Sequence, residues 1–272
     1  MILREEAEQI LKEIPVEPRW EEVSLEDCRG RVLAEDIISP LDLPPFDKSA
    51  MDGYALRSAD RAEKYRIVEV IAAGSRPQRA LQPGECAKIM TGGMLPPGAN
   101  RVVKREVTRE EDGWLIIVGE DKGPNVCYCG EDIRRGDVVL KKGTLLRPPE
   151  VAVLASVGVN QVKVYQPPSV GLLATGSEIV PPGQPLREGQ IYDSNTYSLA
   201  AQVAETGARL KRVVRGRDDP ALLRHELEKL LDECELVLVS GGVSVGDYDY
   251  VPTILQELGV QIHFHKLAIK PG

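Results

Sequence analysis

The sequence predicts a multidomain protein that combines an α+β part with an α/β part whose sheet is mostly parallel. Two observations lead to this prediction. After Pro167 and Pro168, strand-like and helix-like segments alternate strictly, which is typical of βαβ units. Between residues 44 and 142, short β-like runs alternate with Gly/Pro turns, which indicates a small, mostly-β domain.

The composition is that of a folded globular protein. The 272 residues are 42% hydrophobic and 28% charged, which excludes a disordered chain and a fibrous repeat. The net charge of −8 argues against a general nucleic-acid binder. No apolar stretch approaches the roughly 20 residues of a membrane-spanning helix, and the acidic start does not resemble a signal peptide. Five scattered cysteines favour a reducing, cytoplasmic setting, and the Cys127–Cys129 pair lacks further zinc ligands nearby.

The first region is predicted to be helical. Apolar residues recur at helical spacing over residues 3–14, and Pro15 follows as a stop signal. A second helix is predicted to begin at Ser24, with Asp27 in the capping-box position, and to end before Pro40.

Residues 143–166 are predicted to pack back on this first region. They hold a short helix that starts at Pro148, followed by a strand over residues 161–165. We therefore expect residues 1–43 and 143–166 to form a discontinuous domain. Residues 44–142 would then be an inserted β-rich domain, with β-like runs at 65–74, 85–90, 101–107 and 114–120.

Residues 167–272 form the predicted α/β domain. Helices are expected over residues 197–207, 219–233 and 250–259, and strands over 169–176, 208–214, 235–240 and 260–266. Asp219 is a predicted N-cap, because Pro220 suits the first position of a helix. The run 235–240 is almost wholly apolar, as in a buried parallel strand.

Candidate ligand-binding residues lie after the predicted strands, because open α/β sheets bind ligands at the carboxyl ends of their strands. The loop that starts at Ser240 offers three glycines and two serine hydroxyl groups, which suit an anion such as a phosphate. Its spacing fits neither a P-loop nor a dinucleotide fingerprint, and the alternative is a plain glycine-rich turn. The anion-binding candidates of these loops are Thr175, Gly176, Ser240, Gly241, Gly242 and Ser244.

Charged residues at the same edge suggest a metal-bridged anion. Glu178, Asp218 and Asp249 would repel a phosphate unless a cation such as Mg²⁺ joined them to it. The alternative interpretation is that they cap helices, which fits Asp218 equally well. Lys266 and Lys270 either neutralise an anion or are solvated surface lysines. A long irregular loop over residues 44–57 suggests a function that its residues alone do not define.

Eight segments in order carry a family resemblance. They are PPFDKSAMDGYALR, KIMTGGMLPPGANRVV, GEDIRRGD, LLATGSEIV, GQIYDSNTY, RDDP, SGGVSVGDYDYV and KLAIKPG. Together they resemble the molybdopterin molybdenumtransferase family, which includes the gephyrin E domain. The resemblance implies Mg²⁺-dependent insertion of molybdate, or tungstate in some members, into adenylylated molybdopterin with release of AMP. Two alternatives stay open, namely an enzyme like the related molybdopterin adenylyltransferase and a non-catalytic molybdopterin-binding or dimerisation fragment.

The resemblance also implies an architecture and partners. Family members have an elongated discontinuous domain, an inserted β domain, a three-layer α/β molybdopterin-binding domain and a C-terminal β domain. They form homodimers with active sites shared between subunits, and a contact with molybdopterin adenylyltransferase is a further expectation. The family continues beyond Gly272, so this sequence is expected to have an incomplete α/β domain and no C-terminal β domain. Either it is a fragment of a longer protein, which we favour, or it is a naturally shortened form.

The family motifs also point to site residues. The catalytic carboxylates that the resemblance implies are Asp52, Asp132, Glu178, Asp218 and Asp249. We expect Glu178, Asp218 and Asp249 to hold the metal as well. The resemblance adds Thr91, Lys266 and Lys270 as substrate- or anion-binding residues, and Arg134 and Arg135 as helpers.

Overall fold

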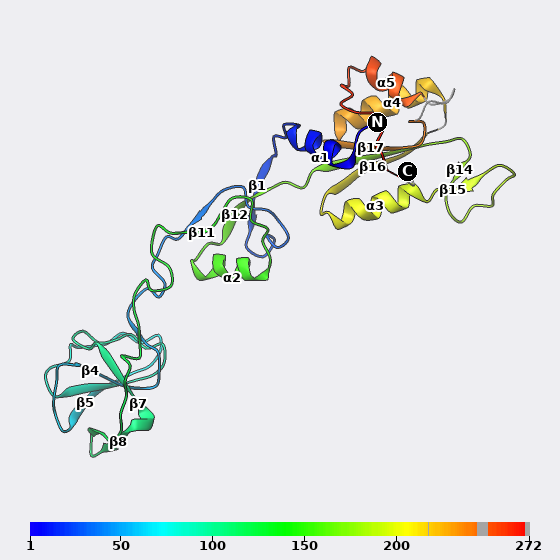
Figure 1. Cartoon of the computed structure of the whole chain (residues 1–272). Helices are drawn as coiled ribbons and strands as arrows, with labels where there is room; N and C mark the ends of the chain where they lie inside the picture. Colours follow the sequence, from blue (N-terminus) through cyan, green and yellow to red (C-terminus); the bar gives the residue numbers. More distant parts are fainter. Residues whose placement is uncertain (217, 244–249, 270–272) are drawn as a thin grey trace. The chain divides into compact units, whose positions relative to one another are not determined.

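The computed structural model describes residues 1–216, 218–243 and 250–269 (Figure 1). The chain divides into two compact units. Residues Met1–Glu21 and Tyr165–Gly272 form the first, here called the α/β unit, and Glu22–Val164 form the second, here called the β unit. Both contain sheets and helices, so the protein has a multidomain α+β fold. Within the described residues, no helix is long and apolar enough to cross a membrane.

The α/β unit is built on a parallel sheet. Its elements are α1 (Arg4–Glu13), β13 (Ser169–Thr175), β14 (Ile179–Val180), β15 (Ile191–Tyr192), α3 (Asn195–Glu205), β16 (Arg209–Gly216), α4 (Pro220–Glu233), β17 (Leu236–Ser240) and α5 (Val251–Glu257). In the three-stranded sheet, β13 lies between β16 and β17 and is parallel to both.

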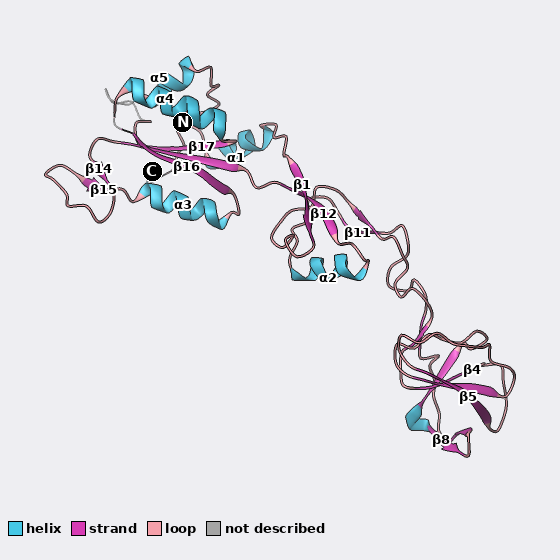
Figure 2. Cartoon of the chain, turned by 180° about the vertical axis from the view of Figure 1, so that it is seen from behind, coloured by secondary structure: helices cyan, strands magenta, loops and turns pink. Residues whose placement is uncertain are grey.

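Alternate residues of β13 pack against helices on opposite faces of this sheet. Val170 and Leu172 share a core cluster with Val203 of α3. Leu173 packs instead with Leu223 of α4 and with neighbouring residues of α4 and α5. Helices therefore cover both faces of the sheet, as Figures 1 and 2 show.

The predicted segments of this unit are mostly confirmed, with ends shifted by a few residues. The structure confirms Asp219 as the N-cap of α4, because its side chain accepts hydrogen bonds from the backbone N–H groups of Ala221 and Leu222. The strand over residues 235–240 also forms, but as an edge of the described sheet, where Leu236 is 49% exposed. Full burial was therefore the wrong expectation for β17.

The predicted strand over residues 260–266 does not form. Its alternating pattern is a local property, whereas a strand also needs a neighbouring strand for its hydrogen bonds. In this segment's neighbourhood the structure shows only an isolated bridge between Leu267 and Ile2.

The β unit contains a six-stranded sheet in the order β7-β4-β6-β5-β9-β8. Its elements are β4 (Gly53–Leu56), β5 (Tyr65–Ile71), β6 (Glu85–Ile89), β7 (Arg101–Lys104), the 3₁₀ turn η1 (Arg105–Val107), β8 (Thr108–Glu111) and β9 (Trp114–Ile117). Two clusters of buried side chains form its core, one around Ile89 and one around Leu115. Part of the loop predicted to be irregular over residues 44–57 is thus strand β4.

The rest of the β unit comes from both ends of its sequence. Its elements are β1 (Trp20–Ser24), β2 (Ile37–Ile38), β3 (Lys48–Ser49), β10 (Val126–Cys127), β11 (Val138–Leu140), α2 (Pro148–Ser156) and β12 (Gln161–Tyr165). β1 pairs with β12, β2 with β11 and β3 with β10. One core cluster joins Cys28, Leu33 and Ile37 to Leu146 and Leu154, so residues before and after the six-stranded sheet pack together.

The helix predicted from Ser24 is wrong. Residues 20–24 form β1, and turns follow. The Ser24 hydroxyl donates to the Asp27 carboxylate at 2.9 Å, and the Cys28 thiol donates to the Leu25 carbonyl at 3.1 Å. Short polar side chains can stabilise a turn with the same local hydrogen bonds that begin a helix, so the Ser-x-x-Asp signal does not separate the two.

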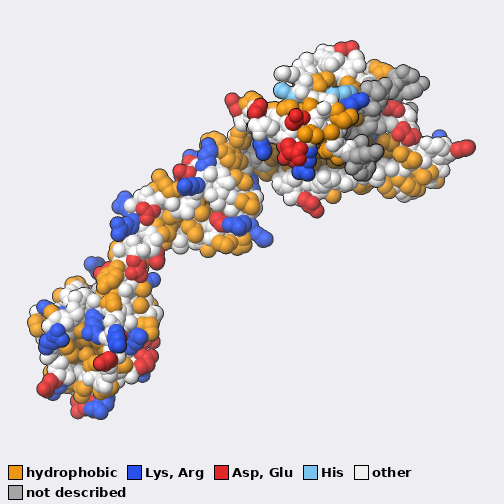
Figure 3. All heavy atoms as spheres, viewed as in Figure 1, with side chains coloured by type: hydrophobic (Ala, Val, Ile, Leu, Met, Phe, Trp, Pro, Cys, Tyr) orange, Lys and Arg blue, Asp and Glu red, His pale blue; other side chains and the backbone are white. Residues whose placement is uncertain are grey.

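Acidic and basic side chains are mixed on the visible surface. Figure 3 shows both kinds spread over the two units on that face, with hydrophobic side chains between them. Candidate functional side chains are therefore sought in particular loops and at strand ends.

Candidate functional site

The carboxyl ends of the three parallel strands meet at one edge of the α/β unit. In the register of the sheet, Thr175 lies opposite Gly216, and Ala174 lies opposite Ser240. The loops that follow β13, β16 and β17 therefore start side by side. This edge brings together most of the predicted site residues of the unit, namely Thr175, Gly176, Glu178, Asp218, Ser240, Gly241 and Gly242.

The turn after β17 packs tightly against the end of β13. Gly241 and Gly242 have φ angles of +89° and +62°. A Cβ atom on Gly241 would lie 2.3 Å from the Thr175 carbonyl oxygen, and one on Gly242 would lie 2.7 Å from Thr175 Oγ1. The close approach to a backbone oxygen requires glycine at position 241, and the positive φ together with the Thr175 hydroxyl favours glycine at position 242. The turn can thus bring its backbone amides close to a ligand.

Thr175 carries an unused polar atom beside this turn. The residue is 2% exposed, and its Oγ1 has no hydrogen-bond partner within the described residues. Buried hydroxyl groups are normally paired, so this hydroxyl beside the glycine turn leaves hydrogen-bonding capacity that a ligand or a water molecule can use.

Asp218 links two of the loops. Its Oδ2 accepts a hydrogen bond of 2.9 Å from the backbone N–H of Ser177, and its own backbone N–H lies 3.5 Å from Ser177 Oγ. Because Asp219 caps α4, the capping alternative for Asp218 is wrong. Glu178 is exposed at the same edge.

No metal centre is assembled in the described part of the chain. Within residues 1–216, 218–243 and 250–269, there is no group of three or more His, Cys, Asp or Glu side chains that could hold a metal ion. Glu178 and Asp218 are two of the three predicted metal ligands, and the third, Asp249, lies outside the described residues. Ser244 and Lys270 lie outside them as well.

Sequence reasoning missed two polar contacts at the start of α3. Asp193 is 3% exposed and accepts hydrogen bonds from Arg215 Nε at 2.8 Å and from the Thr196 backbone N–H at 3.0 Å. Burial opposes the ionisation of Asp193, but these hydrogen bonds outweigh it and lower the pKa of its carboxyl group. The Asn195 amide Nδ2 donates to Ser240 Oγ at 2.9 Å. The motif GQIYDSNTY, which contains Asp193 and Asn195, was the signal in the sequence that could have pointed to these contacts.

In the β unit, Asp52 pairs with Thr91. Asp52 Oδ1 accepts two hydrogen bonds of 2.7 Å, one from the Thr91 backbone N–H and one from its hydroxyl group. The backbone bond first, and then the hydroxyl bond, lower the pKa of Asp52. The backbone of the next residue is closely packed, because a Cβ on Gly53 would lie 2.1 Å from the Val103 carbonyl oxygen.

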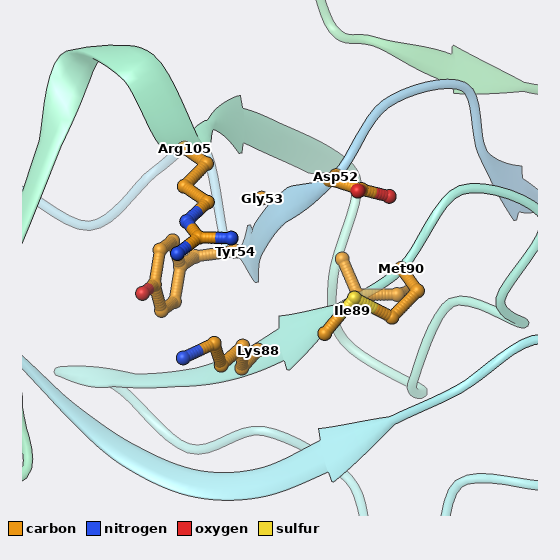
Figure 4. A pocket seen from close by; sticks show the side chains of 7 residues that line it. All are labelled: Asp52, Gly53, Tyr54, Lys88, Ile89, Met90 and Arg105. Atoms are coloured by element: carbon orange, nitrogen blue, oxygen red, sulfur yellow. The ribbon is translucent and has the colours of Figure 1, made fainter.

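A small hollow lies beside this pair (Figure 4), with a volume of about 10 Å³. The Tyr54 hydroxyl donates to Glu110 Oε2 at 2.9 Å, and Lys88 Nζ lies 2.8 Å from the same oxygen. Burial and the neighbouring Glu110 raise the pKa of Tyr54 to about 12, so it remains a neutral donor. Figure 4 shows the Asp52 carboxylate directed away from Lys88 and Arg105.

The remaining predicted residues lie elsewhere. Asp132 is exposed in the β unit, where its backbone N–H donates to the Leu43 carbonyl at 3.0 Å. The backbone N–H groups of Arg134 and Arg135 bond to Asp137 and Asp42. Lys266 is exposed in the α/β unit, and its carbonyl oxygen accepts from the backbone N–H of Ile2 at 2.9 Å. Contacts among the described residues thus bring together the residues of the sheet edge, and join Asp52 to Thr91. They do not bring Asp132 or Lys266 to either group.

Two family models match successive parts of the chain. Residues 2–158 match the family model of the MoeA N-terminal region (domain I and II). Residues 171–272 match a model described as a probable molybdopterin binding domain.

Individual relatives point to the same family. The chain is 42% identical over 258 residues to a molybdopterin molybdenumtransferase of Nostoc sp., which covers 92% of this chain and 59% of the relative. It is 37% identical over 268 residues to the one from Haemophilus influenzae, covering 97% and 66%. The chain therefore spans less than two thirds of the length of these curated relatives.

A solved structure agrees as well. The crystal structure of a molybdopterin biosynthesis MoeA protein from Pyrococcus horikosii superposes with a TM-score of 0.86 at 36% identity, covering all of this chain and 70% of that one. The eight motifs, the matched regions and the fold lead to one conclusion: the chain belongs to the molybdopterin molybdenumtransferase (MoeA) family.

Proposed function

We propose that the whole protein acts in molybdenum cofactor biosynthesis and transfers molybdate into adenylylated molybdopterin with release of AMP. The observation that carries this proposal is the carboxyl edge of the parallel sheet, with its glycine turn beside the Thr175 hydroxyl, which has no hydrogen-bond partner among the described residues. This edge lies within the region that matches a probable molybdopterin binding domain. Its amides and hydroxyl groups suit the phosphate oxygens of such a substrate.

The donor set at this edge suits Mg²⁺. Asp218 uses Oδ2 for the Ser177 amide, which leaves Oδ1 for a cation, and the Glu178 carboxylate is exposed beside it. Mg²⁺ prefers oxygen ligands, retains water molecules, and commonly binds one or two carboxylates together with substrate phosphates. When bound, the ion would neutralise phosphate charge, and Asp249 is our proposed third ligand.

The chain's own residues would divide the work. Ser240, Gly241 and Gly242 would hold the anionic end of the substrate, and the Ser177–Asp218 contact would keep the two carboxylate loops together. Asp52 keeps a low pKa through Thr91, so it would be ionised at neutral pH and able to accept hydrogen bonds or bind a cation. Asp132, Lys266 and Lys270 remain proposed site residues on the family resemblance.

Further aspects of the whole protein are proposals from the family. We propose a cytoplasmic homodimer that can contact molybdopterin adenylyltransferase. We also propose the finer division into a discontinuous domain (1–43 and 143–166), an inserted β domain (44–142) and a three-layer molybdopterin-binding domain from residue 167.

The test uses the full-length protein, Mg²⁺, molybdate and adenylylated molybdopterin, with released AMP as the readout. We expect D218N and D52N each to lower AMP release by about 100-fold, as loss of a charged group at a metal-assisted site does. D232N is the matched control, because Asp232 is an exposed carboxylate of α4 far along the helix from its capped end. Consumption of ATP with molybdopterin would instead favour the adenylyltransferase alternative. Binding without turnover of either substrate would favour the non-catalytic one.

A further inference from the structure

A row of side chains crosses the carboxyl edge of the sheet under the start of α3. Ala174 of β13 lies opposite Arg215 of β16 on one side and opposite Ser240 of β17 on the other. Residues opposite one another in a sheet point to the same face. Because Val170 and Leu172, at alternate positions of the same strand, pack on α3, this row also lies on the α3 face.

Asn195, the first residue of α3, reaches this row. Its Nδ2 donates a hydrogen bond of 2.9 Å to Ser240 Oγ. A serine hydroxyl has one proton to donate and two lone pairs that accept. An oxygen that accepts from the Asn195 amide cannot direct its own proton at that amide. Among residues 1–216, 218–243 and 250–269, no group accepts the Ser240 proton, so within the described part of the chain it has no competing acceptor.

The position of Asn195 is held by its neighbours. Asp193 binds the Thr196 backbone N–H, and its second oxygen binds Arg215 Nε on β16. Arg215 also lies over the Tyr197 ring, with the guanidinium carbon 5.4 Å from the ring centroid. The start of α3 is therefore tied to the sheet on both sides of Asn195. Asn195 itself is exposed and adds little to the core.

We propose that Asn195 is a positioning residue for ligand binding at this edge. By donating to Ser240 Oγ, it directs the Ser240 proton toward an anionic oxygen of the ligand, such as the phosphate of molybdopterin. Hydrogen bonds to a charged acceptor are stronger than those between neutral groups, so the orientation of one hydroxyl proton affects affinity. This inference rests on the proposed function for the identity of the ligand, and extends it to a residue that does not touch the ligand.

The experiment measures dissociation constants of the full chain for molybdopterin, under anaerobic conditions, and separately for inorganic phosphate. We expect S240A to weaken molybdopterin binding by about 10-fold, because one hydrogen bond to the ligand is lost. N195A should weaken it by about 5-fold, because the Ser240 proton loses its orientation. N195D has the same shape as Asn195 but accepts the Ser240 proton, so we expect a loss of at least about 10-fold.

Double variants separate orientation from other effects. In the S240A background, N195A should change binding by less than about 2-fold, because its effect is transmitted through the Ser240 hydroxyl. In the S240A background, N195D should also have little effect on binding. A loss of binding caused only by repulsion between the introduced carboxylate and the anionic ligand would persist in that background. Q202A is the matched control: Gln202 of the same helix donates to Ser198 Oγ at 3.2 Å, an exposed amide–hydroxyl pair away from the edge, and its loss should leave both affinities unchanged. Thermal unfolding of each variant checks the fold.

The outcomes distinguish this inference from the proposed function. Binding of molybdopterin by the wild type with additive N195A and S240A effects, or with N195D equal to wild type, overturns the inference alone. Phosphate binding that shows the coupling, without molybdopterin binding, overturns the proposed function and supports the inference. If the wild type binds neither ligand, both are overturned.

Discussion

Asp52 and Asp218 are two candidate site carboxylates that the fold holds in different ways. Asp52 directly precedes a strand, and both of its hydrogen bonds come from one residue, Thr91. Asp218 lies in a loop beyond a strand and is held by a reciprocal contact with Ser177 of another loop. The β unit therefore holds its carboxylate through one partner residue, beside a strand that is closely packed at Gly53. The α/β unit places its carboxylate through contacts between two loops.

The largest effects are expected at the two glycines that make the closest approaches. G53A in the β unit and G241A in the α/β unit should each lower the free energy of unfolding by about 3 kcal/mol, because each Cβ would meet a backbone oxygen within 2.3 Å. Hydrogen exchange should locate the loss of protection in the unit that carries the substitution.

Matched controls separate crowding from backbone strain. Gly74 and Gly207 have φ angles of +80° and +78°, and a Cβ on either would meet nothing within 4 Å. G74A and G207A should therefore cost only about 1 kcal/mol. Equal costs at all four glycines would contradict the role of close approach.

R215A should have the next largest effect, about 2 kcal/mol, because it leaves the buried Asp193 carboxylate without its cation. The side chain of Arg215 is 37% exposed, so solvent screening reduces the cost below that of a fully buried pair. R4A is the control, since the Arg4–Glu8 pair is largely exposed and should contribute under about 0.5 kcal/mol.

The effect of R215A should depend on pH. The pKa of Asp193 is lowered in the folded protein from its ordinary value of 3.8, so the ionised group stabilises the fold above that value. This stabilisation is lost as pH falls through the folded-state pKa. Urea unfolding should show the full difference between wild type and R215A at pH 7 and a shrinking difference below about pH 4. A difference that is independent of pH would contradict the ion-pair explanation.

Substitutions of the adjacent residues Asp218 and Asp219 should have different effects on stability and on activity. D219A removes the α4 cap and should cost about 1 kcal/mol in unfolding measurements. D218A removes only an exposed hydrogen bond from the Ser177 amide and should cost less, about 0.5 kcal/mol. In the AMP-release assay of the full-length protein, D218A should instead have the larger effect and D219A the smaller one. D219A as the more damaging variant in both assays would contradict the assignment of Asp218 to the site.

The smallest effect is expected at the Asp52–Thr91 pair. T91V removes the hydroxyl donor but keeps the backbone donor, which contributes more to the lowered pKa of Asp52. The pKa of Asp52 should therefore rise only part of the way toward 3.8, as carboxyl ¹³C NMR titration would measure. T206V, which removes a hydroxyl of the α/β unit, should leave it unchanged.

The sequence predicts features that rest on local signals. The cap of α4 follows from Asp219 and Pro220, and the parallel sheet follows from the alternation of apolar strands and helices. The shared edge of Thr175 and Ser240 then follows from the topology, because parallel strands end on the same side.

Contacts between distant residues could not be predicted in this way. Thr91 meets Asp52 across 39 positions, and Asn195 meets Ser240 across 45 positions. Neither contact leaves a periodic or turn signal. For the same reason, the alternation in residues 260–266 predicted a strand without a neighbour to pair with, and Ser24 predicted a helix where its side chain closes a turn.

The contact between Thr175 and the glycine turn limits amino-acid substitution differently at the two neighbouring positions 241 and 242. A side chain at position 241 would meet the carbonyl oxygen of residue 175, which every amino acid carries, so no change at 175 relieves the clash. A side chain at position 242 would meet Thr175 Oγ1, which a smaller residue at 175 removes. Across relatives, Gly241 should be invariant. The residue at 242 should instead covary with the one at 175, with asparagine the first substitute because it tolerates positive φ.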